Sequence, residues 1–394
     1  MVGQSFKLKV GIKFYLLFFV MIFLYYIFDI FIFNRKYRKR DFLISGLINL
    51  LIFYLLIIYF DKNILIVGFF IYTLFQNAIK YLYNFIFSYP QRVVLLSDKS
   101  EKDLESAIGK NESFSYGGWI NLNEIEKIKD LKPNEVIYPI EITNQAVNEI
   151  YALKMSGIKV MDSMVFLQEF EGKISVDSIS KEWVIATKGF EVLHSIFERK
   201  LKRVLDICMS LGILMIGAPF MVVTYIFVKL DNPKNFLKNP AFFRQKRIGF
   251  GGEEFEIIKF RSMKLHNPNE YSKYASEKDN RITKVGKFIR KTRLDELPQI
   301  FNVLRGEMSF VGPRPEWNEL GREYEEKIKM YKVRYIVKPG LTGWAQVMYP
   351  YGASLDDAKK KLEYDIYYIK YQNLLLDMII LLKTVKVVLF GKGT

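Results

Sequence analysis

Apolar and aromatic residues gather near the beginning of the chain in long runs. The first, from Phe14 to Phe33, is interrupted only by Asp29, and the second extends from Phe42 to Phe60. A third run, from Ile64 to about Phe87, contains polar residues toward its end. A helix of about 20 apolar residues spans the roughly 30 Å of a bilayer's hydrocarbon core. Residues 1–88 are therefore predicted to form about three transmembrane helices.

Loop charges predict the orientation of these helices, because short cytoplasmic loops carry an excess of Lys and Arg. The connection at residues 35–40 is strongly basic and is predicted to be cytoplasmic, whereas the nearly neutral Asp61-Lys62-Asn63 is predicted to lie outside. The N-terminal tail also carries lysines, which favour the inside. Both ends of a spanning helix cannot face inward, so we interpret the first run as a span with its tail outside.

From Arg92 the pattern changes to short apolar strands that alternate with polar, helix-compatible stretches. Strands are predicted at 93–96, 136–140 and 158–161, and helices at 101–108 and 143–155. This alternation predicts a small parallel, Rossmann-like α/β domain over residues 89–196. The first strand leads into Ser97-Asp98-Lys99-Ser100 instead of a Gly-x-Gly-x-x-Gly turn. We therefore expect no dinucleotide here and favour a structural or regulatory role.

Another apolar run, Val204 to Val228, is long enough to span a bilayer but has Pro219 in its interior. Lys and Arg flank the run on both sides, which favours the cytoplasm for both ends. Pro219 removes one helical hydrogen bond and clashes with the preceding turn. We therefore predict a re-entrant helix-break-helix over residues 201–230, against the alternative of a kinked ordinary span.

The last apolar run, Leu374 to Phe390, is shorter and contains Asp377, Lys383 and Lys386. It is predicted to form an amphipathic helix that lies in the membrane interface. Packing of this helix against the soluble part of the chain is the alternative, and the pattern leaves both open.

Composition narrows the classes of function. The chain has 394 residues, of which 50% are hydrophobic, and its formal net charge is +16, which favours anionic lipid or phosphate-rich ligands as partners. Nucleic acid is not expected, because no zinc-finger, RNA-binding or basic-zipper pattern occurs. With Cys208 as its one cysteine, and with His194 and His266 as its two histidines, the chain has neither a disulfide framework nor a zinc-ligand pattern. Its chemistry must use carboxylates and basic groups, and it could include a hard metal ion.

The densest chemistry lies between residues 239 and 345. A basic run ending at Arg247 leads into a glycine-rich turn, Gly249 to Gly252. Farther on, Asp295 and Glu296 follow a strongly basic stretch, and Pro298 places the two carboxylates at a helix junction. The plainer alternative is a solvated helix with charge pairs.

Close to this pair in sequence, Arg314 lies between Pro313 and Pro315, whose fixed φ angles reduce the cost of ordering a phosphate contact. Asp295 could act as a nucleophile on phosphorus, and Glu296 could help hold Mg²⁺. Basic residues could line the same anionic pocket; the candidates are Lys259, Arg261, Arg290 and Arg293. The residues could therefore support phosphoryl transfer, but their spacing alone leaves the plainer alternative open.

Several strings in the C-terminal half, from about Lys200 onward, closely resemble the bacterial sugar transferases, the polyprenyl-phosphate glycosyl-1-phosphate transferases. They are Lys202-Arg203-x-x-Asp206, Lys259-Phe260-Arg261-Ser262-Met263, Leu294-Asp295-Glu296-Leu297-Pro298-Gln299, Ser309-Phe310-Val311-Gly312-Pro313-Arg314-Pro315 and the run from Lys338 to Val347. The family's re-entrant helix breaks at a Ser-Pro pair, which here is Ala218-Pro219. The resemblance implies a mostly helical, monotopic catalytic domain over residues 197–394. The N-terminal half looks like the large members, which usually show four spanning helices where we predict three.

By this resemblance, Asp295 would be the nucleophile that takes a sugar-1-phosphate from a UDP-sugar and releases UMP. Glu296 would be its partner, with Mg²⁺ bound by the pair, and Pro313 and Arg314 would recognise phosphate. The phosphosugar would pass to polyprenyl (undecaprenyl) phosphate on the cytoplasmic face of the bacterial inner membrane, as the first membrane step of exopolysaccharide, capsule or O-antigen biosynthesis.

Alternative functions are a membrane-anchored nucleotide-sugar oxidoreductase or sensor that uses the α/β domain, and a regulator or scaffold of polysaccharide assembly. The sequence leaves the sugar unidentified, with its contacts expected within residues 314–365. It also leaves the oligomeric state open, a homo-oligomer included.

Overall fold

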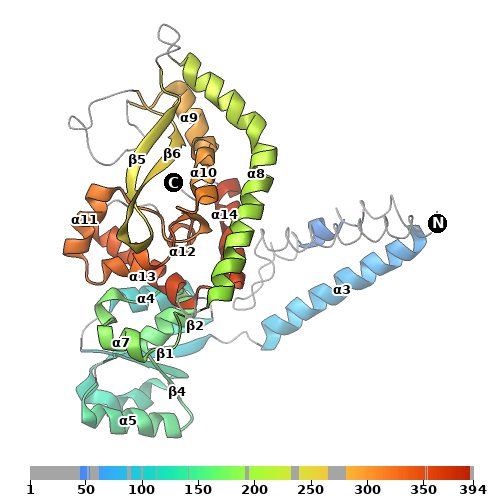
Figure 1. Ribbon diagram of the computed structural model, residues 1–394. Helices are drawn as coiled ribbons and strands as arrows, with labels where there is room; N and C mark the ends of the chain where they lie inside the picture. Colours follow the sequence, from blue (N-terminus) through green and yellow to red (C-terminus); the bar gives the residue numbers. More distant parts are fainter. Residues whose placement is uncertain are drawn as a thin grey trace. The chain divides into compact units, whose positions relative to one another are not determined.

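The computed structural model describes residues 45–50, 53, 62–86, 90–98, 101–111, 113–140, 142–190, 195–231, 239–264, 281–350, 352 and 354–390. The chain divides into two compact units, Met1–Glu171 and Gly172–Thr394, which we describe separately (Figure 1). The predicted first span lies outside the described residues, and so does most of the second. The third coincides with helix α3, Lys62–Ile86, on which Phe70, Leu74 and Phe85 are exposed.

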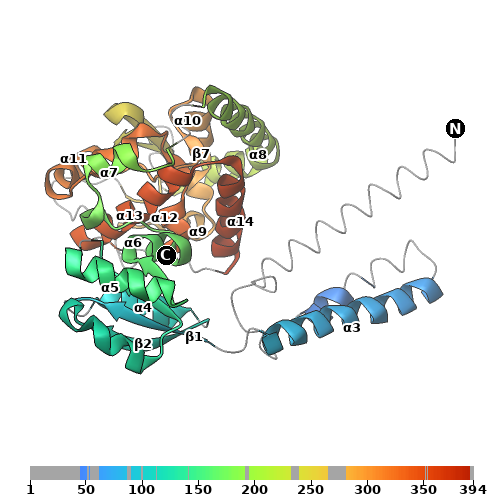
Figure 2. The ribbon, with the colours of Figure 1, turned by 90° about the horizontal axis from the view of Figure 1, so that it is seen from below.

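The first unit contains a four-stranded sheet in which every pair of neighbouring strands is parallel, in the order β2-β1-β3-β4 (Figure 2). The strands are β1 (Gln91–Leu96), β2 (Phe114–Ile120), β3 (Glu135–Tyr138) and β4 (Lys159–Asp162). Its helical segments are α4 (Lys102–Lys110), η1 (Leu122–Leu131), α5 (Asn144–Met155), α6 (Ser163–Phe166) and η2 (Leu167–Glu171). The predicted strands and helices of this region are thus confirmed, with β2 in addition.

The centre of this sheet is apolar on both faces. Val94 and Leu96 of β1 pack in one buried cluster with residues of η1 and α5, whereas Val93 and Leu95 pack in another with residues of α4 and α6. A strand that is buried on both faces reads as a continuous apolar run, which is why the pattern in the sequence reveals it.

The second unit begins at Gly172, within the range that the sequence assigned to the α/β domain. Trp344 Nε1 donates a hydrogen bond to Gly172 O (2.7 Å), and Phe190 N donates to Lys370 O (2.9 Å). The intervening residues form η3 (Val176–Ser178) and α7 (Lys181–Ala186). Residues 172–190 therefore pack with the C-terminal half.

The remaining elements of this unit pack around a larger apolar cluster, to which Val303, Phe310 and Trp344 contribute, and a smaller one formed by Val228, Ala241, Phe260 and Ile289. The strands are β5 (Phe242–Ile248) and β6 (Glu254–Phe260), which form an antiparallel hairpin, and β7 (Ser309–Val311) and β8 (Gly340–Thr342), which pair in parallel. The helices are α8 (Ile196–Leu230), α9 (Lys284–Lys291), η8 (Leu294–Gln299), α10 (Ile300–Arg305), α11 (Asn318–Lys327), η9 (Tyr331–Ile336), α12 (Trp344–Met348), α13 (Leu355–Tyr371) and α14 (Leu374–Phe390).

Helix α8 is continuous through Ala218 and Pro219, so the predicted separation into two helices is not present. The ribbon instead curves along its length (Figure 1). A proline inside a helix removes one hydrogen bond, and the helix can absorb that loss by bending without unwinding. The structure contains no membrane, so the placement of both ends of α8 on one side of a membrane stays a prediction.

Close backbone approach shapes the segment that follows β7. Gly312 N donates to Thr342 O (2.9 Å), and a Cβ atom added at Gly312 would lie 2.3 Å from Lys338 O. A Cβ atom at Gly343 would lie 2.2 Å from Gly312 O. These backbones can pass one another only because neither residue has a side chain.

Gly312→Ala is therefore expected to destabilise the second unit by about 3 kcal/mol, because the clash is with backbone that cannot rotate away. Thermal unfolding of the purified protein in detergent measures the change. Gly212→Ala in α8 is the matched control, since nothing lies within 4 Å of its Cβ position. An unchanged transition in Gly312→Ala would contradict the close approach described here.

Candidate active site

The two adjacent carboxylates lie at a change of chain direction. Helix α9 begins with Thr283, whose hydroxyl accepts a hydrogen bond from Gly286 N, and Arg293 then adopts a left-handed conformation (φ 58°). Asp295 and Glu296 follow in the short 3₁₀ helix η8, which contains Pro298 and leads directly into α10. The helix junction predicted from Pro298 is confirmed.

Glu296 is held by two cations from different elements. Its Oε1 accepts from Lys259 Nζ of β6 (2.9 Å) and from Arg314 Nη2 (3.0 Å). Burial alone would raise the pKa of this carboxyl, but the attraction of Lys259 and Arg314 outweighs burial and holds the pKa well below its usual range. Glu296 is therefore ionised at neutral pH in the folded chain.

Asp295 lies in a different environment although it is the next residue. Burial and the neighbouring Glu296 charge raise the pKa of its carboxyl to about 6, against the opposing attraction of Lys259, Arg290 and Arg293. Its Oδ1 is buried and has no hydrogen-bond partner among the described residues. Two neighbouring carboxylates with separated pKa values can take different chemical roles. Here Glu296 is an anion held by two cations, and Asp295 has a carboxyl oxygen without a hydrogen-bond partner among the described residues.

The structure brings most of the sequence-predicted site residues together. Lys259 and Arg314 both contact Glu296, and Arg290 lies close enough to Asp295 to lower its pKa. Pro313 precedes Arg314 in the same segment, and its carbonyl accepts a hydrogen bond from Gly340 N (2.9 Å).

Arg261 lies elsewhere. It is buried, and its Nη1 donates to Asn239 Oδ1. Asn239 Nδ2 in turn donates to Val228 O and Lys229 O at the end of α8 (3.2 and 3.1 Å). The hydrogen bond of Arg261 to Asn239 thus supports the C-terminus of α8, and the role of Arg261 in phosphate binding stays a prediction.

Sequence reasoning did not single out Arg247, which faces the same site from β5. Burial and the like charge of Arg314 lower the pKa of its guanidinium to about 10, and Glu296 and Glu316 oppose this change. The basic run that contains Arg247 is visible in the sequence. Which of its cations faces the site is not, because it follows from the pairing of β5 with β6.

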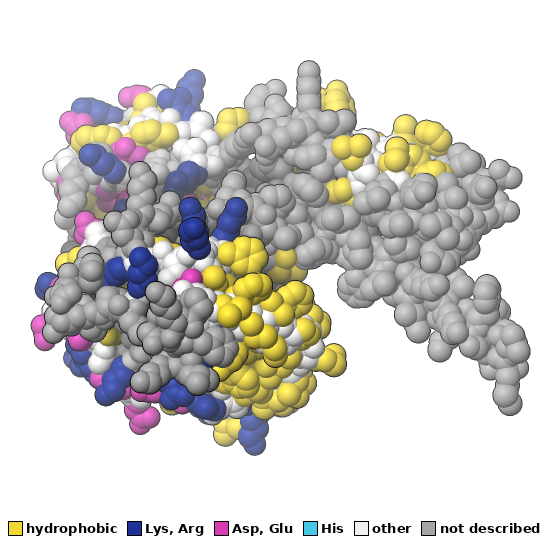
Figure 3. All heavy atoms as spheres, turned by 90° about the horizontal axis from the view of Figure 1, so that it is seen from above, with side chains coloured by type: hydrophobic (Ala, Val, Ile, Leu, Met, Phe, Trp, Pro, Cys, Tyr) yellow, Lys and Arg dark blue, Asp and Glu magenta, His cyan; other side chains and the backbone are white. Residues whose placement is uncertain are grey.

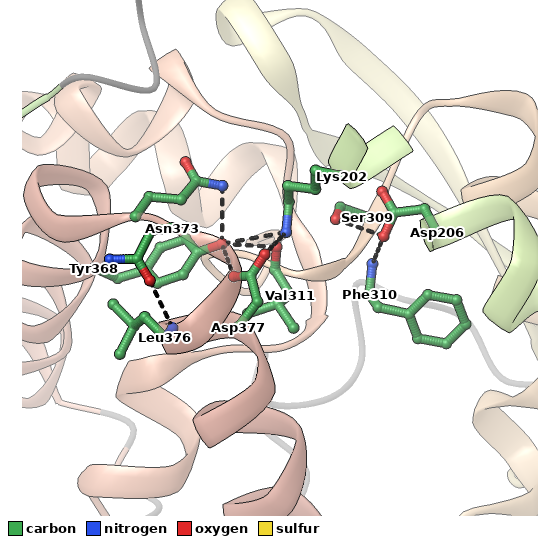
Figure 4. A network of polar contacts seen from close by, with 10 residues as sticks. Lys202, Asp206, Ser309, Phe310, Val311, Tyr368, Asn373, Leu376 and Asp377 are labelled. Carbon is green, nitrogen blue, oxygen red and sulfur yellow. Dashed lines mark hydrogen bonds and ion pairs between the residues drawn. The ribbon is translucent and has the colours of Figure 1, made fainter. Parts of the chain in front are cut away.

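The residues of the Lys202-Arg203-x-x-Asp206 string attach α8 to the elements next to the site. Asp206 Oδ1 accepts from Ser309 Oγ and Phe310 N in β7 (both 3.0 Å), and Lys202 Nζ contacts Asp377 Oδ2 in α14 (2.5 Å) (Figure 4). Arg203 donates to Val303 O and Leu304 O of α10 (2.5 and 2.7 Å). One helix therefore holds both the segment after Glu296 and the strand before Arg314.

Beyond these anchors, α8 carries a continuous apolar surface (Figure 3). Among the described residues it is the one helix long and apolar enough to cross a membrane, judged by length and composition, and 17% of its most apolar window is buried. Met215, Ile216 and Phe220 are among its exposed side chains. Exposed apolar area of this extent is typical of a surface that contacts lipid.

Asp295 and Glu296 could hold a hard cation together with the phosphates of a substrate. The described residues contain no group of three metal-ligating side chains. Asp295 and Glu296 are adjacent carboxylates in η8, and Mg²⁺ commonly combines one or two carboxylates with substrate phosphates. The pair fits such a cation.

Replacing Asp295 tests its environment. Because the pKa of this carboxyl is raised, the folded chain binds more protons than the unfolded chain between the usual 3.8 and about 6. The charge on Asp295 therefore costs stability as pH rises through about 6. Asp295→Asn should raise the free energy of unfolding at pH 7 by on the order of 2 kcal/mol and change it little near pH 4.

Thermal unfolding at both pH values measures this difference, with the exposed Asp356→Asn in α13 as a matched control. A difference of the same size at both pH values would show that Asp295 is not buried beside Glu296.

Comparisons with known proteins agree with this geometry. The family model described as bacterial sugar transferase matches residues 197–391. A UDP-N-acetylgalactosamine-undecaprenyl-phosphate N-acetylgalactosaminephosphotransferase of Aeromonas hydrophila is 43% identical over 49% of this chain and 44% of that protein. A UDP-glucose:undecaprenyl-phosphate glucose-1-phosphate transferase of Caulobacter vibrioides is 39% identical over 47% of this chain and 68% of its own length.

An undecaprenyl-phosphate galactose phosphotransferase of Salmonella typhimurium is 39% identical over 50% of this chain and 42% of that protein. The chain spans less than half the length of the first curated relatives it matches. The matched residues include Asp295 and Glu296, the Pro-Arg-Pro segment, and the residues at 202, 203 and 206 that attach α8. This chain belongs to the bacterial sugar transferase family.

Proposed function

We propose that this protein transfers a sugar-1-phosphate from a UDP-sugar to polyprenyl phosphate and releases UMP. The observation that carries the proposal is the unengaged Oδ1 of Asp295 beside a carboxylate that Lys259 and Arg314 hold in place. The similar proteins described above are named for undecaprenyl-phosphate sugar transfer, which supports the same reaction class.

In the first step, Asp295 Oδ1 attacks the phosphorus that carries the sugar. The P–O bond to UMP breaks, UMP leaves with the electron pair, and a phosphosugar-aspartate intermediate forms. Arg314, whose side chain is 40% exposed, can meet the phosphate oxygens while it keeps its contact with Glu296. In the second step a phosphate oxygen of polyprenyl phosphate attacks the same phosphorus, which frees the Asp295 carboxylate.

Mg²⁺ is the proposed cofactor, held by Asp295 and Glu296 together with the phosphates of the donor. It would neutralise phosphate charge. Lys259 and Arg314 keep Glu296 ionised and oriented for this purpose, and the basic residues around Asp295 keep part of its carboxyl population ionised near neutral pH.

The acceptor is a lipid, so the site must lie at a membrane surface. We propose that α8 is re-entrant and that the catalytic unit lies on the cytoplasmic face of the bacterial inner membrane, where polysaccharide assembly begins. Helix α14 supports both interpretations of the last apolar run, because Ile380 is fully buried in the core whereas Leu375 and Met378 are exposed. The named relatives differ in their sugar, so we assign none to this chain.

Purified protein should release UMP over many turnovers only when Mg²⁺, a UDP-sugar and polyprenyl phosphate are all present. Asp295→Asn should lower this rate by about a thousandfold or more, because it removes the nucleophile. A panel of UDP-sugars with UMP detection makes the measurement and also identifies the donor. Asp356→Asn controls for the loss of a surface carboxylate, and undiminished turnover in Asp295→Asn would reject the role of Asp295.

The topology has its own test. Reporter tags inserted after residue 196 and added at the C-terminus should both be found in the cytoplasm, since the two ends of a re-entrant α8 lie on one side. Labelling of a cysteine placed in each tag, in intact cells and in inverted vesicles, measures the side of the membrane on which the tag lies. Tags on opposite sides would show that α8 crosses the membrane.

A further inference from the structure

The backbone of the Pro-Arg-Pro segment is held through its carbonyl oxygens. Proline has no N–H, so Pro313 and Pro315 cannot donate main-chain hydrogen bonds. All three carbonyls of the segment accept one: Pro313 O from Gly340 N (2.9 Å), Arg314 O from Arg334 Nη2 (2.8 Å) and Pro315 O from Arg247 Nη1 (3.0 Å). Two of the three donors are arginine side chains from distant parts of the sequence.

Arg334 is itself fixed. It is 7% exposed, and the Nη2 that reaches Arg314 O also contacts Asp365 Oδ2 (2.9 Å), a carboxylate that is 3% exposed. Its Nη1 donates to the Tyr331 hydroxyl, and its guanidinium lies 5.0 Å from the centre of the Tyr331 ring. Glu316 Oε1 lies 3.8 Å from Nη1. Such a network leaves the guanidinium a single orientation.

Arg247 reaches the segment from the other side. Its Nη2 donates to Gln245 Oε1 (2.7 Å), which leaves Nη1 directed at Pro315 O. The next residue, Ile248, donates its N–H to Glu316 O (3.2 Å), so the end of β5 is also tied to the chain just after the segment. The planar fork of an arginine binds two acceptors in fixed directions, which the single ammonium of a lysine cannot do.

We propose that Arg334 and Arg247 are positioning residues, which set the place of the Arg314 guanidinium against Glu296 and against the donor's phosphates. The two prolines fix φ on either side of Arg314, so a displaced carbonyl moves the whole tripeptide and with it the arginine side chain. This inference rests on the proposed function, because it gives Arg314 a phosphate to bind. Neither arginine needs to touch the substrate.

Arg334→Lys and Arg247→Lys keep the charge and remove the fork. Each should raise the KM for the UDP-sugar and lower kcat/KM by about tenfold to a hundredfold, with the KM for polyprenyl phosphate unchanged. In an Arg314→Ala background the same substitutions should have little further effect, since the side chain they position is gone. Arg322→Lys is the matched control, because this exposed arginine also donates to a main-chain carbonyl, Gly252 O (3.2 Å).

UDP affinity, measured by calorimetry, gives a readout that does not need turnover, and it should fall by about tenfold in each lysine variant and in Arg314→Ala. The positioning role would be overturned if the losses in UDP affinity or kcat/KM multiplied when a lysine substitution was combined with Arg314→Ala. It would also be overturned if the KM values for both substrates rose equally. If Arg334→Lys fails to fold, Arg247→Lys alone decides. A parent protein that neither binds UDP nor releases UMP from any UDP-sugar would instead overturn the proposed function and this inference with it.

Discussion

The contact on which the site depends is the pair of hydrogen bonds that Glu296 accepts from Lys259 and Arg314. These three side chains come from a short helix, a hairpin strand and a proline-bounded turn. Removing either cation would leave a carboxylate that is largely buried and only half compensated, which is among the costliest changes in a protein interior. The same contact gives Asp295 and Glu296 different environments. Glu296 takes both hydrogen bonds, and Asp295 keeps an oxygen with no hydrogen-bond partner in the part of the chain that the structure describes.

The site's geometry depends on contacts to its backbone, which both main-chain and charged side-chain groups supply. Gly312 and Gly343 let two segments approach closely, and the carbonyls around Arg314 are each bound by a donor. Helix α8 adds a common support, since its first turns bind β7 through Asp206 and α10 through Arg203. The chemistry is thus built on elements that the packing of the unit already fixes.

The local part of this arrangement could be predicted from the sequence. Pro298 marks the helix junction, and the apolar runs of β1 and β3 reveal a parallel sheet. β2 was missed because Gly117 and Gly118 interrupt it and because it is only partly buried, so no apolar run or clean alternation marks it. Arg334 gave no signal, because it lies in a short 3₁₀ helix and meets Arg314 only through tertiary packing. Arg261 stands in a matching string, yet its neighbours in space, and not its string, determine what it contacts.

The attachment of α8 has a mechanical consequence. Its apolar surface meets lipid in the proposed arrangement, while its first turns grip the strand before Arg314 and the helix after Glu296. A helix that is attached at one end can convert a change of its tilt into a displacement at the attached end. Bilayer thickness and lateral tension, which set the tilt of an inserted helix, would then change the distance between Asp295 and Arg314. The lipid phase would be a component of the catalyst and not only its anchor.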